Sequence, residues 1–201
     1  MSIVDFVFPR VCVGCSMEGE YICLKCFAKI HKPIQICPTC CKPSIDGWTH
    51  ARCKKSNGLD RLIIGLPYKG LVQDCLKKVK YKSAWDIIDF LYNKSEFADL
   101  DDSIVTAVPM WIEKERSRGF NQAEIFAELI SKQFNNRYIR VLERLRDTKP
   151  MFGLNKNDRM LNVRDSFRMI DPKILNLYGK KILLVDDVWT TGATMRECVT
   201  V

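Results

Sequence analysis

The residue pattern best suited to chemistry follows an apolar segment at residues 182–185. Two acids, Asp186 and Asp187, come directly after it, and a polar turn follows. The turn consists of Thr190, Thr191, Gly192, Ala193 and Thr194. Backbone N–H groups and hydroxyls of such a turn, with the start of a following helix, can bind a phosphate. Because carboxylates repel phosphate, the two acids suit ribose hydroxyl groups, or a magnesium ion held mainly by ligand and water.

The position of these acids also favours a ligand site. Residues 180–188 read as a continuous apolar strand, typical of a covered parallel sheet. In open parallel sheets, ligands bind at the carboxyl ends of the strands. Gly192 permits positive φ and close backbone approach. The pattern leaves one alternative open, which is a strand end with ordinary surface acids and a threonine that caps the next helix.

Cysteine pairs dominate the first 53 residues, which hold eight of the ten cysteines. The pairs are Cys12 with Cys15, Cys23 with Cys26, Cys37 with Cys40, and His50 with Cys53. Zinc takes four ligands and prefers thiolate and imidazole, and a two-residue gap lets both members of a pair reach one ion. The simplest pairing predicts two structural zinc sites, each built from two consecutive pairs.

Several readings of these cysteines stay open. An interleaved pairing would use the same residues, and reduced structural cysteines or another metal would give the same pattern. His50 could be an exposed loop histidine. Cys41 fits no pair and is interpreted as a bystander or a substitute ligand, whereas Cys75 and Cys198 are expected in the core.

Composition narrows the class of protein. Hydrophobic residues make up 47% and charged residues 28%, as in ordinary globular chains. The net charge of +8 favours an anionic partner such as phosphate, nucleotide or nucleic acid. The sequence contains no run of eighteen apolar residues, so it predicts no membrane-spanning helix. The first residues lack the basic start of a secretion signal, so we expect a cytoplasmic protein whose cysteines hold metal rather than disulfides.

The order of apolar segments predicts an α/β domain after the cysteine pairs. We place the boundary near residue 57, with a double zinc ribbon at 1–57 and the α/β domain at 58–201. The expected strands are 61–66, 103–109, 138–142 and 180–188. The expected helices are 71–81, 84–95, a helix capped by Asn121 with Glu124 in a capping box, and 193–201. Residues 144–166 are interpreted as a long basic loop.

The acidic turn resembles the phosphoribosyl diphosphate (PRPP) motif of type I phosphoribosyltransferases, and the wider chain resembles the ComF family, which is competence-associated. The matching segments are the cysteine pairs, 66–70, 78–82, 108–109, 116–123, Arg144-x-Arg146-x-Thr148, Arg159, 162–163 and the two acids. His50 stands at a position where the family commonly has cysteine, and Met151 stands near a position where glutamine is common. Family members usually continue beyond Val201, so the resemblance implies a domain truncated there.

The resemblance implies a type I phosphoribosyltransferase-like parallel sheet with helices on both faces, preceded by the double ribbon. It implies binding of magnesium and PRPP, with transfer of phosphoribosyl to an unknown nitrogen acceptor. Asp186 and Asp187 would then be catalytic and hold the ribose, and residues 190–194 would bind its 5′-phosphate. The pyrophosphate or a lid would involve Val108, Pro109, Arg116, Arg118, Arg144 and Arg146.

A second hypothesis is a non-catalytic factor of DNA uptake and recombination that binds single-stranded DNA or an uptake protein. Lysines 77, 78, 80 and 82 would meet phosphates, although a solvated face explains them equally. Aromatic residues near basic ones could stack on bases. These are Trp48, Tyr68, Tyr81, Trp85 and Trp111.

Overall fold

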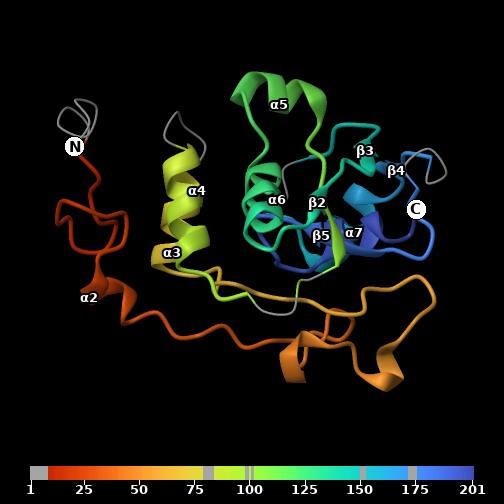
Figure 1. Ribbon diagram of the computed structural model, residues 1–201, viewed down its shortest axis with the longest axis horizontal. Helices are drawn as coiled ribbons and strands as arrows, with labels where there is room; N and C mark the ends of the chain where they lie inside the picture. Colours follow the sequence, from red (N-terminus) through yellow and green to blue (C-terminus); the bar gives the residue numbers. More distant parts are fainter. Residues whose placement is uncertain (1–8, 79–83, 98–99, 101, 150–152, 172–175) are drawn as a thin grey trace. The chain divides into compact units, whose positions relative to one another are not determined.

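The computed structural model describes the chain except residues 1–8, 79–83, 98–99, 101, 150–152 and 172–175 (Figure 1). By packing, the chain divides into two compact units. Unit 1 contains residues 1–34 and 64–96, and unit 2 contains residues 35–63 and 97–201. The boundary near residue 57 stays a prediction. Across the described residues, every helix is too short or too polar to cross a membrane.

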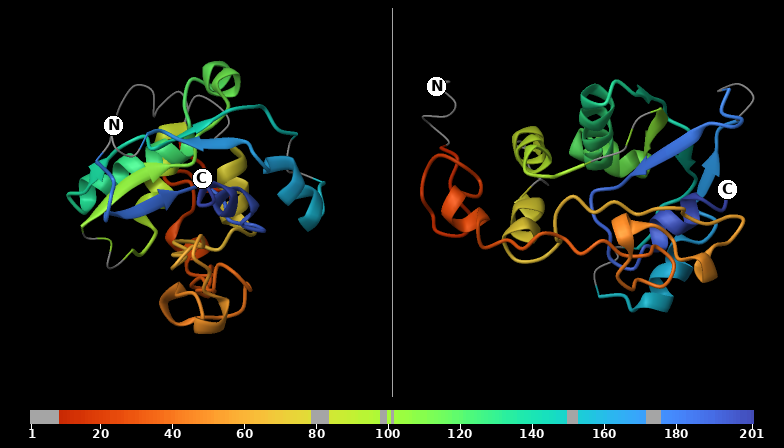
Figure 2. Two further views of the ribbon diagram at one scale, coloured as in Figure 1. Left: turned by 90° about the vertical axis from the view of Figure 1, so that its right-hand side faces the viewer. Right: turned by 60° about the horizontal axis from the view of Figure 1, so that its bottom comes forward.

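Unit 2 is built on a parallel sheet whose central strand is β1 (Ser103–Ala107). Strand β2 (Arg137–Tyr138) pairs with one side of β1, and strand β5 (Lys181–Val185) pairs with the other. The pairing of β1 with β5 runs in register from Ser103 with Lys181 to Ala107 with Val185. This arrangement confirms the predicted α/β class with a parallel sheet (Figure 2).

Helix α6 (Gln122–Gln133) packs against all three of these strands. The Asn121 side chain accepts a hydrogen bond of 3.1 Å from the N–H of Ala123, which confirms the predicted cap. The capping box is wrong, because the Glu124 carboxylate pairs with Arg140 at 2.7 Å. Arg140 supplies a full charge, a stronger partner than a backbone N–H.

The basic segment after β2 holds more regular structure than predicted. Strand β3 (Leu142–Arg144) pairs antiparallel with β4 (Phe167–Met169). Along the chain, helix α7 (Lys156–Val163) comes between these two strands. Its N-terminus is capped by Asn155, whose side chain accepts a 3.0 Å hydrogen bond from the N–H of Asp158. The single loop predicted at 144–166 is therefore wrong. The strand predicted at 138–142 is split between the end of β2 and the start of β3.

Two further helices flank the strand ends of unit 2. Helix α5 (Ile112–Arg118) follows β1, and helix α9 (Ala193–Cys198) follows β5. Gly119 ends α5 in the left-handed conformation, with φ of 82°. These helices bring their neighbouring loops to the carboxyl edge of the sheet.

The rest of unit 2 is the second cysteine ribbon, with short turns η1 (Ile45–Gly47) and η2 (Ala51–Cys53). Residues 59–62 run antiparallel to residues 47–49, and the N–H of Leu62 bonds to the Gly47 carbonyl at 3.0 Å. A Cβ at Gly47 would lie 1.8 Å from the Leu62 carbonyl oxygen, so only glycine allows this approach. The apolar segment 61–66 therefore forms one bridge to this ribbon, and the predicted strand is wrong.

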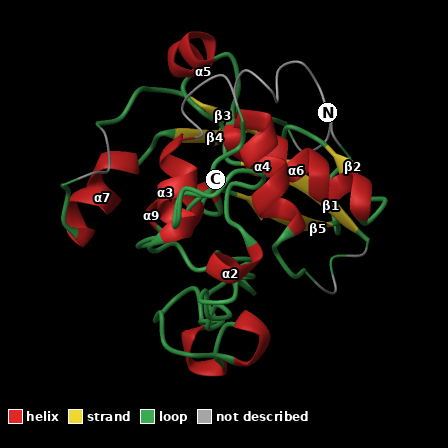
Figure 3. Ribbon diagram, turned by 90° about the vertical axis from the view of Figure 1, so that its left-hand side faces the viewer, coloured by secondary structure: helices red, strands yellow, loops and turns green. Residues whose placement is uncertain are grey.

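Unit 1 joins the first cysteine ribbon, with helix α2 (Leu24–Phe27), to helices α3 (Leu71–Lys78) and α4 (Ala84–Asn93) (Figure 3). Tyr21 meets Phe90 edge to face, with ring centroids 5.9 Å apart. The Cys75 thiol is buried and donates to the Tyr21 carbonyl at 3.8 Å, which confirms its core position. The predicted extension of α3 to residue 81 lies outside the described residues.

Candidate functional site

The carboxyl edge of the sheet brings the two predicted loops together. The N–H of Val108 donates to the carbonyl of Val185 at 2.8 Å, so Val108 and Pro109 leave β1 beside the point where Asp186 and Asp187 leave β5. The Asn121 side-chain amide donates to the Val108 carbonyl at 3.0 Å. The residue that caps α6 therefore also fixes the start of this loop.

The two carboxyl groups interact with each other and with their surroundings. Burial raises the pKa of Asp186 well above its ordinary value, and the charge of Asp187 raises it further. Desolvation also raises the pKa of Asp187, although the nearby Arg118 charge opposes this. The N–H of Asp187 donates to Asp186 Oδ1 at 3.0 Å. Hydroxyl donors or a cation placed here would stabilise both carboxylates.

Three arginines from three elements surround this edge. Arg118, in the last turn of α5, lowers the pKa of Asp187, and Arg144, in β3, lowers the pKa of Asp186. The Arg144 guanidinium also lies 5.3 Å from the centre of the Phe167 ring. Arg159, on α7, donates from Nη1 to Thr190 Oγ1 at 2.9 Å. The edge therefore combines two carboxyl groups with cations suited to an anionic ligand.

The other predicted arginines are placed differently. Arg146 donates to the carbonyls of Asn162 at 3.2 Å and Arg164 at 2.6 Å, and so caps the last turn of α7. Holding a pyrophosphate would require Arg146 to leave these carbonyls. Arg116 is exposed in the last turn of α5. The pyrophosphate role of both residues stays a prediction.

The threonine turn, residues 190–194, connects the acids to α9. Thr190 is exposed, Thr191 and Thr194 are half-buried, and Gly192 and Ala193 are buried. Gly192 precedes α9 with φ of 71°, a left-handed conformation that favours glycine. A Cβ on this residue would also lie 2.2 Å from Cη2 of the Trp189 ring. Glycine is therefore required by both the backbone and the indole.

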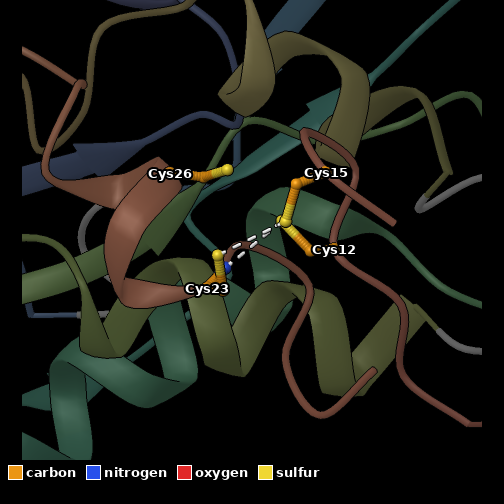
Figure 4. Close-up of side chains that lie close together, drawn as sticks. All are labelled: Cys12, Cys15, Cys23 and Cys26. Carbon is orange, nitrogen blue, oxygen red and sulfur yellow. Dashed lines mark hydrogen bonds between the residues drawn. The ribbon is translucent and has the colours of Figure 1, made fainter. Parts of the chain in front are cut away.

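The first quartet, Cys12, Cys15, Cys23 and Cys26, is a candidate metal centre in unit 1. Its four sulfur atoms all lie within 4.8 Å of one another, and the side chains converge (Figure 4). Burial would raise the pKa of Cys12, but N–H groups of Cys23 and Gly14 donate to its sulfur and lower it to about 6. A thiolate therefore forms readily at Cys12, whereas burial and the neighbouring cysteines raise the pKa of Cys26 to about 12, so that metal binding would displace its proton.

The second quartet, Cys37, Cys40, His50 and Cys53, lies in unit 2 with the same compactness. Cys40 Sγ is 3.4 Å from His50 Nδ1, while His50 Nε2 lies 3.2 Å from the Pro43 carbonyl. A carbonyl on the outer nitrogen orients the ring and leaves Nδ1 for a metal. Backbone N–H groups outweigh burial and lower the pKa of Cys37 to about 6. Both quartets can thus hold zinc in a closed, four-ligand set.

Sequence reasoning missed two residues at this site, Trp189 and Arg196. The Trp189 ring covers Gly192, and the Arg196 guanidinium lies 5.6 Å from the centre of that ring. An aromatic residue within an otherwise polar turn was a usable signal for Trp189. The local pattern around Arg196 carries no such signal, because its partners lie more than 150 residues away.

Comparison with known proteins finds several that are similar to this chain in sequence. The chain is 27% identical over 194 residues to the Competence protein ComFC of Bacillus subtilis (strain 168), covering 88% of this chain and 75% of the relative. It is 26% identical over 210 residues to the DNA utilization protein YhgH of Escherichia coli (strain K12), covering 94% and 88%. It is 31% identical over 98 residues to Competence protein F of Haemophilus influenzae (strain ATCC 51907 / DSM 11121 / KW20 / Rd), covering 46% and 41%.

No family model and no solved structure matches the chain. Two of these relatives nevertheless match most of its length, 88% and 94% of the chain. Their names agree with the resemblance that the cysteine pairs and the threonine turn carry. The names of these relatives support the resemblance to the ComF family.

Proposed function

We propose that unit 2 binds PRPP at the carboxyl edge of its parallel sheet and transfers the phosphoribosyl group to a nitrogen acceptor. The observation that carries this proposal is the in-register pairing of β1 with β5, which sets the loop at Val108 and Pro109 beside Asp186 and Asp187. In this proposal the acids hold the ribose hydroxyls, the threonine turn holds the 5′-phosphate, and the Val108 loop faces the pyrophosphate.

The charges around the edge support an anionic sugar ligand. Arg118 and Arg144 act on the two acids, and Arg159 reaches the turn through Thr190. In the proposed reaction, the acceptor nitrogen bonds to the anomeric carbon while the bond from that carbon to a pyrophosphate oxygen breaks. Pyrophosphate leaves with the electron pair, and the nitrogen proton passes to solvent. Magnesium, when bound, would neutralise part of the pyrophosphate charge.

The two acids and the arginines then have separate roles. Positive charge develops on the ribose as the bond to pyrophosphate breaks, and carboxylates beside it stabilise that charge. The guanidinium groups stabilise the negative charge that grows on the leaving group. Because Asp186 is half-buried, it is held at the edge of the sheet with limited competition from solvent.

Calorimetry of PRPP with magnesium tests the site. Asp187→Asn should weaken binding about ten- to a hundredfold, because a hydrogen bond to a charged group contributes about 1.5–3 kcal/mol. Asp102→Asn is the matched control: Asp102 is exposed at the opposite edge of the sheet, with φ of 53°, which asparagine also tolerates. Equal PRPP affinity in parent and Asp187→Asn would reject the role of the acids, and absent binding by the parent would reject the function.

A role in competence or DNA uptake is supported by the names of the relatives. We infer single-stranded DNA as the second candidate ligand, and one observation favours it. Trp48 in the second ribbon is 50% exposed, with the Arg61 guanidinium 5.2 Å from its ring centre. An exposed aromatic face beside a cation suits a stacked base and its phosphate.

Anisotropy of labelled single strands over a salt series tests this candidate. Trp48→Ala should weaken binding about ten- to a hundredfold, since base stacking contributes about 1–3 kcal/mol per base. Ile45→Ala is the control, because Ile45 is also an exposed apolar residue of the same ribbon but has no ring. The same affinity in Trp48→Ala and the parent would contradict the stacking role.

A further inference from the structure

The guanidinium of Arg196, on α9, is held by one knuckle of the second quartet. Its Nε donates to the Pro38 carbonyl at 2.9 Å. Its Nη2 donates to the carbonyls of Pro38 and Thr39 and to Cys41 Sγ, which lies at 3.4 Å. Pro38 and Thr39 stand between the ligands Cys37 and Cys40. The shape of this knuckle therefore determines where the two carbonyls that Arg196 binds are placed.

The same guanidinium also supports the threonine turn. It lies 5.6 Å from the centre of the Trp189 ring, within the range of a cation–π contact. That ring in turn lies against the backbone of Gly192, where no side chain would fit. The indole Nε1 is buried and has no hydrogen-bond partner among the described residues. The ring is therefore placed by packing rather than by a hydrogen bond from its own nitrogen, and its contacts with Arg196 and Gly192 are part of that packing.

We propose that Arg196 is a positioning residue that ties the threonine turn to the metal-holding knuckle of the second quartet. An ion bound by all four ligands fixes such a knuckle in one shape, because binding at a structural site is coupled to the folding of its ribbon. Loss of the ion would release the Pro38 and Thr39 carbonyls from Arg196. The indole would then lose its cation, and the turn would lose the ring that covers Gly192.

The chemistry of the side chain explains why arginine stands here. One planar group reaches two carbonyls and a sulfur along its edge while its face meets an aromatic ring. A lysine ammonium is a point charge with no such face, so it cannot make both sets of contacts at once. Cys41, which fits no ligand pair, is placed by this contact as a partner of Arg196.

Hydrogen exchange at residues 188–193 of the zinc-loaded chain tests the link without any phosphate ligand. Arg196→Gln should keep both ions by elemental analysis and speed exchange in the turn about ten- to a hundredfold, since bonds from a charged group contribute about 1.5–3 kcal/mol each. Arg196→Lys should resemble Arg196→Gln. Arg61→Gln is the matched control: Arg61 also stacks on a tryptophan and binds a ribbon carbonyl, that of Asp46, but these partners lie within the ribbon.

The second arm removes the second ion through Cys37→Ser. Exchange in the turn should rise as far as in Arg196→Gln, and the two changes together should add little, as for residues acting through one contact. Unchanged exchange in Arg196→Gln would overturn the proposal. So would an additive effect of the two changes, because the ion would then act on the turn by another route.

The effect on ligand binding rests on the proposed function. PRPP affinity should fall about tenfold or more in Arg196→Gln and stay unchanged in Arg61→Gln. An equal fall in both variants would overturn the role of Arg196 as a positioning residue. If the parent itself binds no PRPP, the proposed function fails, while the exchange measurements still decide whether Arg196 ties the turn to the knuckle.

Discussion

At the scale of single residues, Asp186 is a carboxyl group whose ionised form the fold disfavours. Burial and the charge of Asp187 hold its pKa above the unfolded value. A group with a raised native pKa contributes stability at low pH, and this contribution is lost as pH rises through the native pKa. Ionising Asp186 in the native state therefore costs stability, and a ligand that stabilises its carboxylate would offset that cost.

Asp186→Asn should consequently stabilise the ligand-free protein at pH 7, with the gain shrinking as the pH falls below the native pKa of Asp186. Asparagine keeps an oxygen for the N–H of Asp187 and removes the buried charge. Each kcal/mol should raise the melting temperature by about 2–4 °C. Thermal melts from pH 3 to pH 8 measure this. An equal gain at every pH would contradict the assignment to the charge of Asp186.

Gly192 gives a second prediction at this scale. Gly192→Ala should destabilise unit 2 by about 1–2 kcal/mol through left-handed strain alone, and by more because its Cβ would meet the Trp189 ring. In a Trp189→Ala background only the strain remains. Urea unfolding of the four variants measures the difference. If Gly192→Ala lowered the free energy of unfolding equally in both backgrounds, the Trp189 ring would be shown to move aside freely.

At the scale of elements, Asn121 joins helix α6 to the loop after β1. Its oxygen caps the helix and its amide nitrogen donates to the Val108 carbonyl. Asn121→Ala should lose about 1 kcal/mol for the cap, and a further 1–3 kcal/mol for the unsatisfied carbonyl. Asn121→Ser keeps a capping oxygen and removes the donor to Val108 without adding a buried charge.

Unfolding curves and PRPP titrations of both Asn121 variants separate the two roles. We expect Asn121→Ser to retain more stability than Asn121→Ala while both weaken PRPP binding. If Asn121→Ser bound PRPP as well as the parent, the tether to Val108 would have no part in the site.

The elements that sequence predicts well are those whose signals are local. The cysteine pairs are two residues apart, the cap of α6 lies beside its helix, and the acids follow their own strand. Helix α7 was missed because Met160 and Leu161 are exposed and give no apolar face, although Asn155 and Asp158 form a cap at its start. The apolar segment 61–66 gave a false strand, because a close approach at Gly47 diverts it to the ribbon.

The remainder of the site depends on contacts that no local pattern encodes. Arg118, Arg144 and Arg159 come from three elements and meet only when the sheet forms. Arg196 meets Pro38 across 158 positions of sequence. The family resemblance singles out Arg118, Arg144 and Arg159, but the local pattern around each is that of a solvated arginine. The groups that each of them meets are set by folding and required the structure.

At the scale of the whole molecule, the two quartets lie in different units and should bind zinc separately. Elemental analysis of the parent should give two zinc ions per chain. Cys12→Ser and Cys37→Ser should each lose one ion and keep the other, because each structural site couples its own ion to the folding of its own ribbon. Loss of both ions in either variant would contradict independent sites, and one ion in the parent would contradict the tandem pairing.

The chain passes from unit 1 to unit 2 and back before it completes either unit. During synthesis, residues 35–63 emerge long before Arg196, so the contacts that secure them to α9 become available only after Arg196 has been made. Closing so long a loop slows folding, because its entropy is lost before the contacts form. The second ribbon must therefore wait, exposed to chaperones and oxidants, until Arg196 has been synthesised. Its cysteines are the part of the nascent chain that early metal capture would protect most.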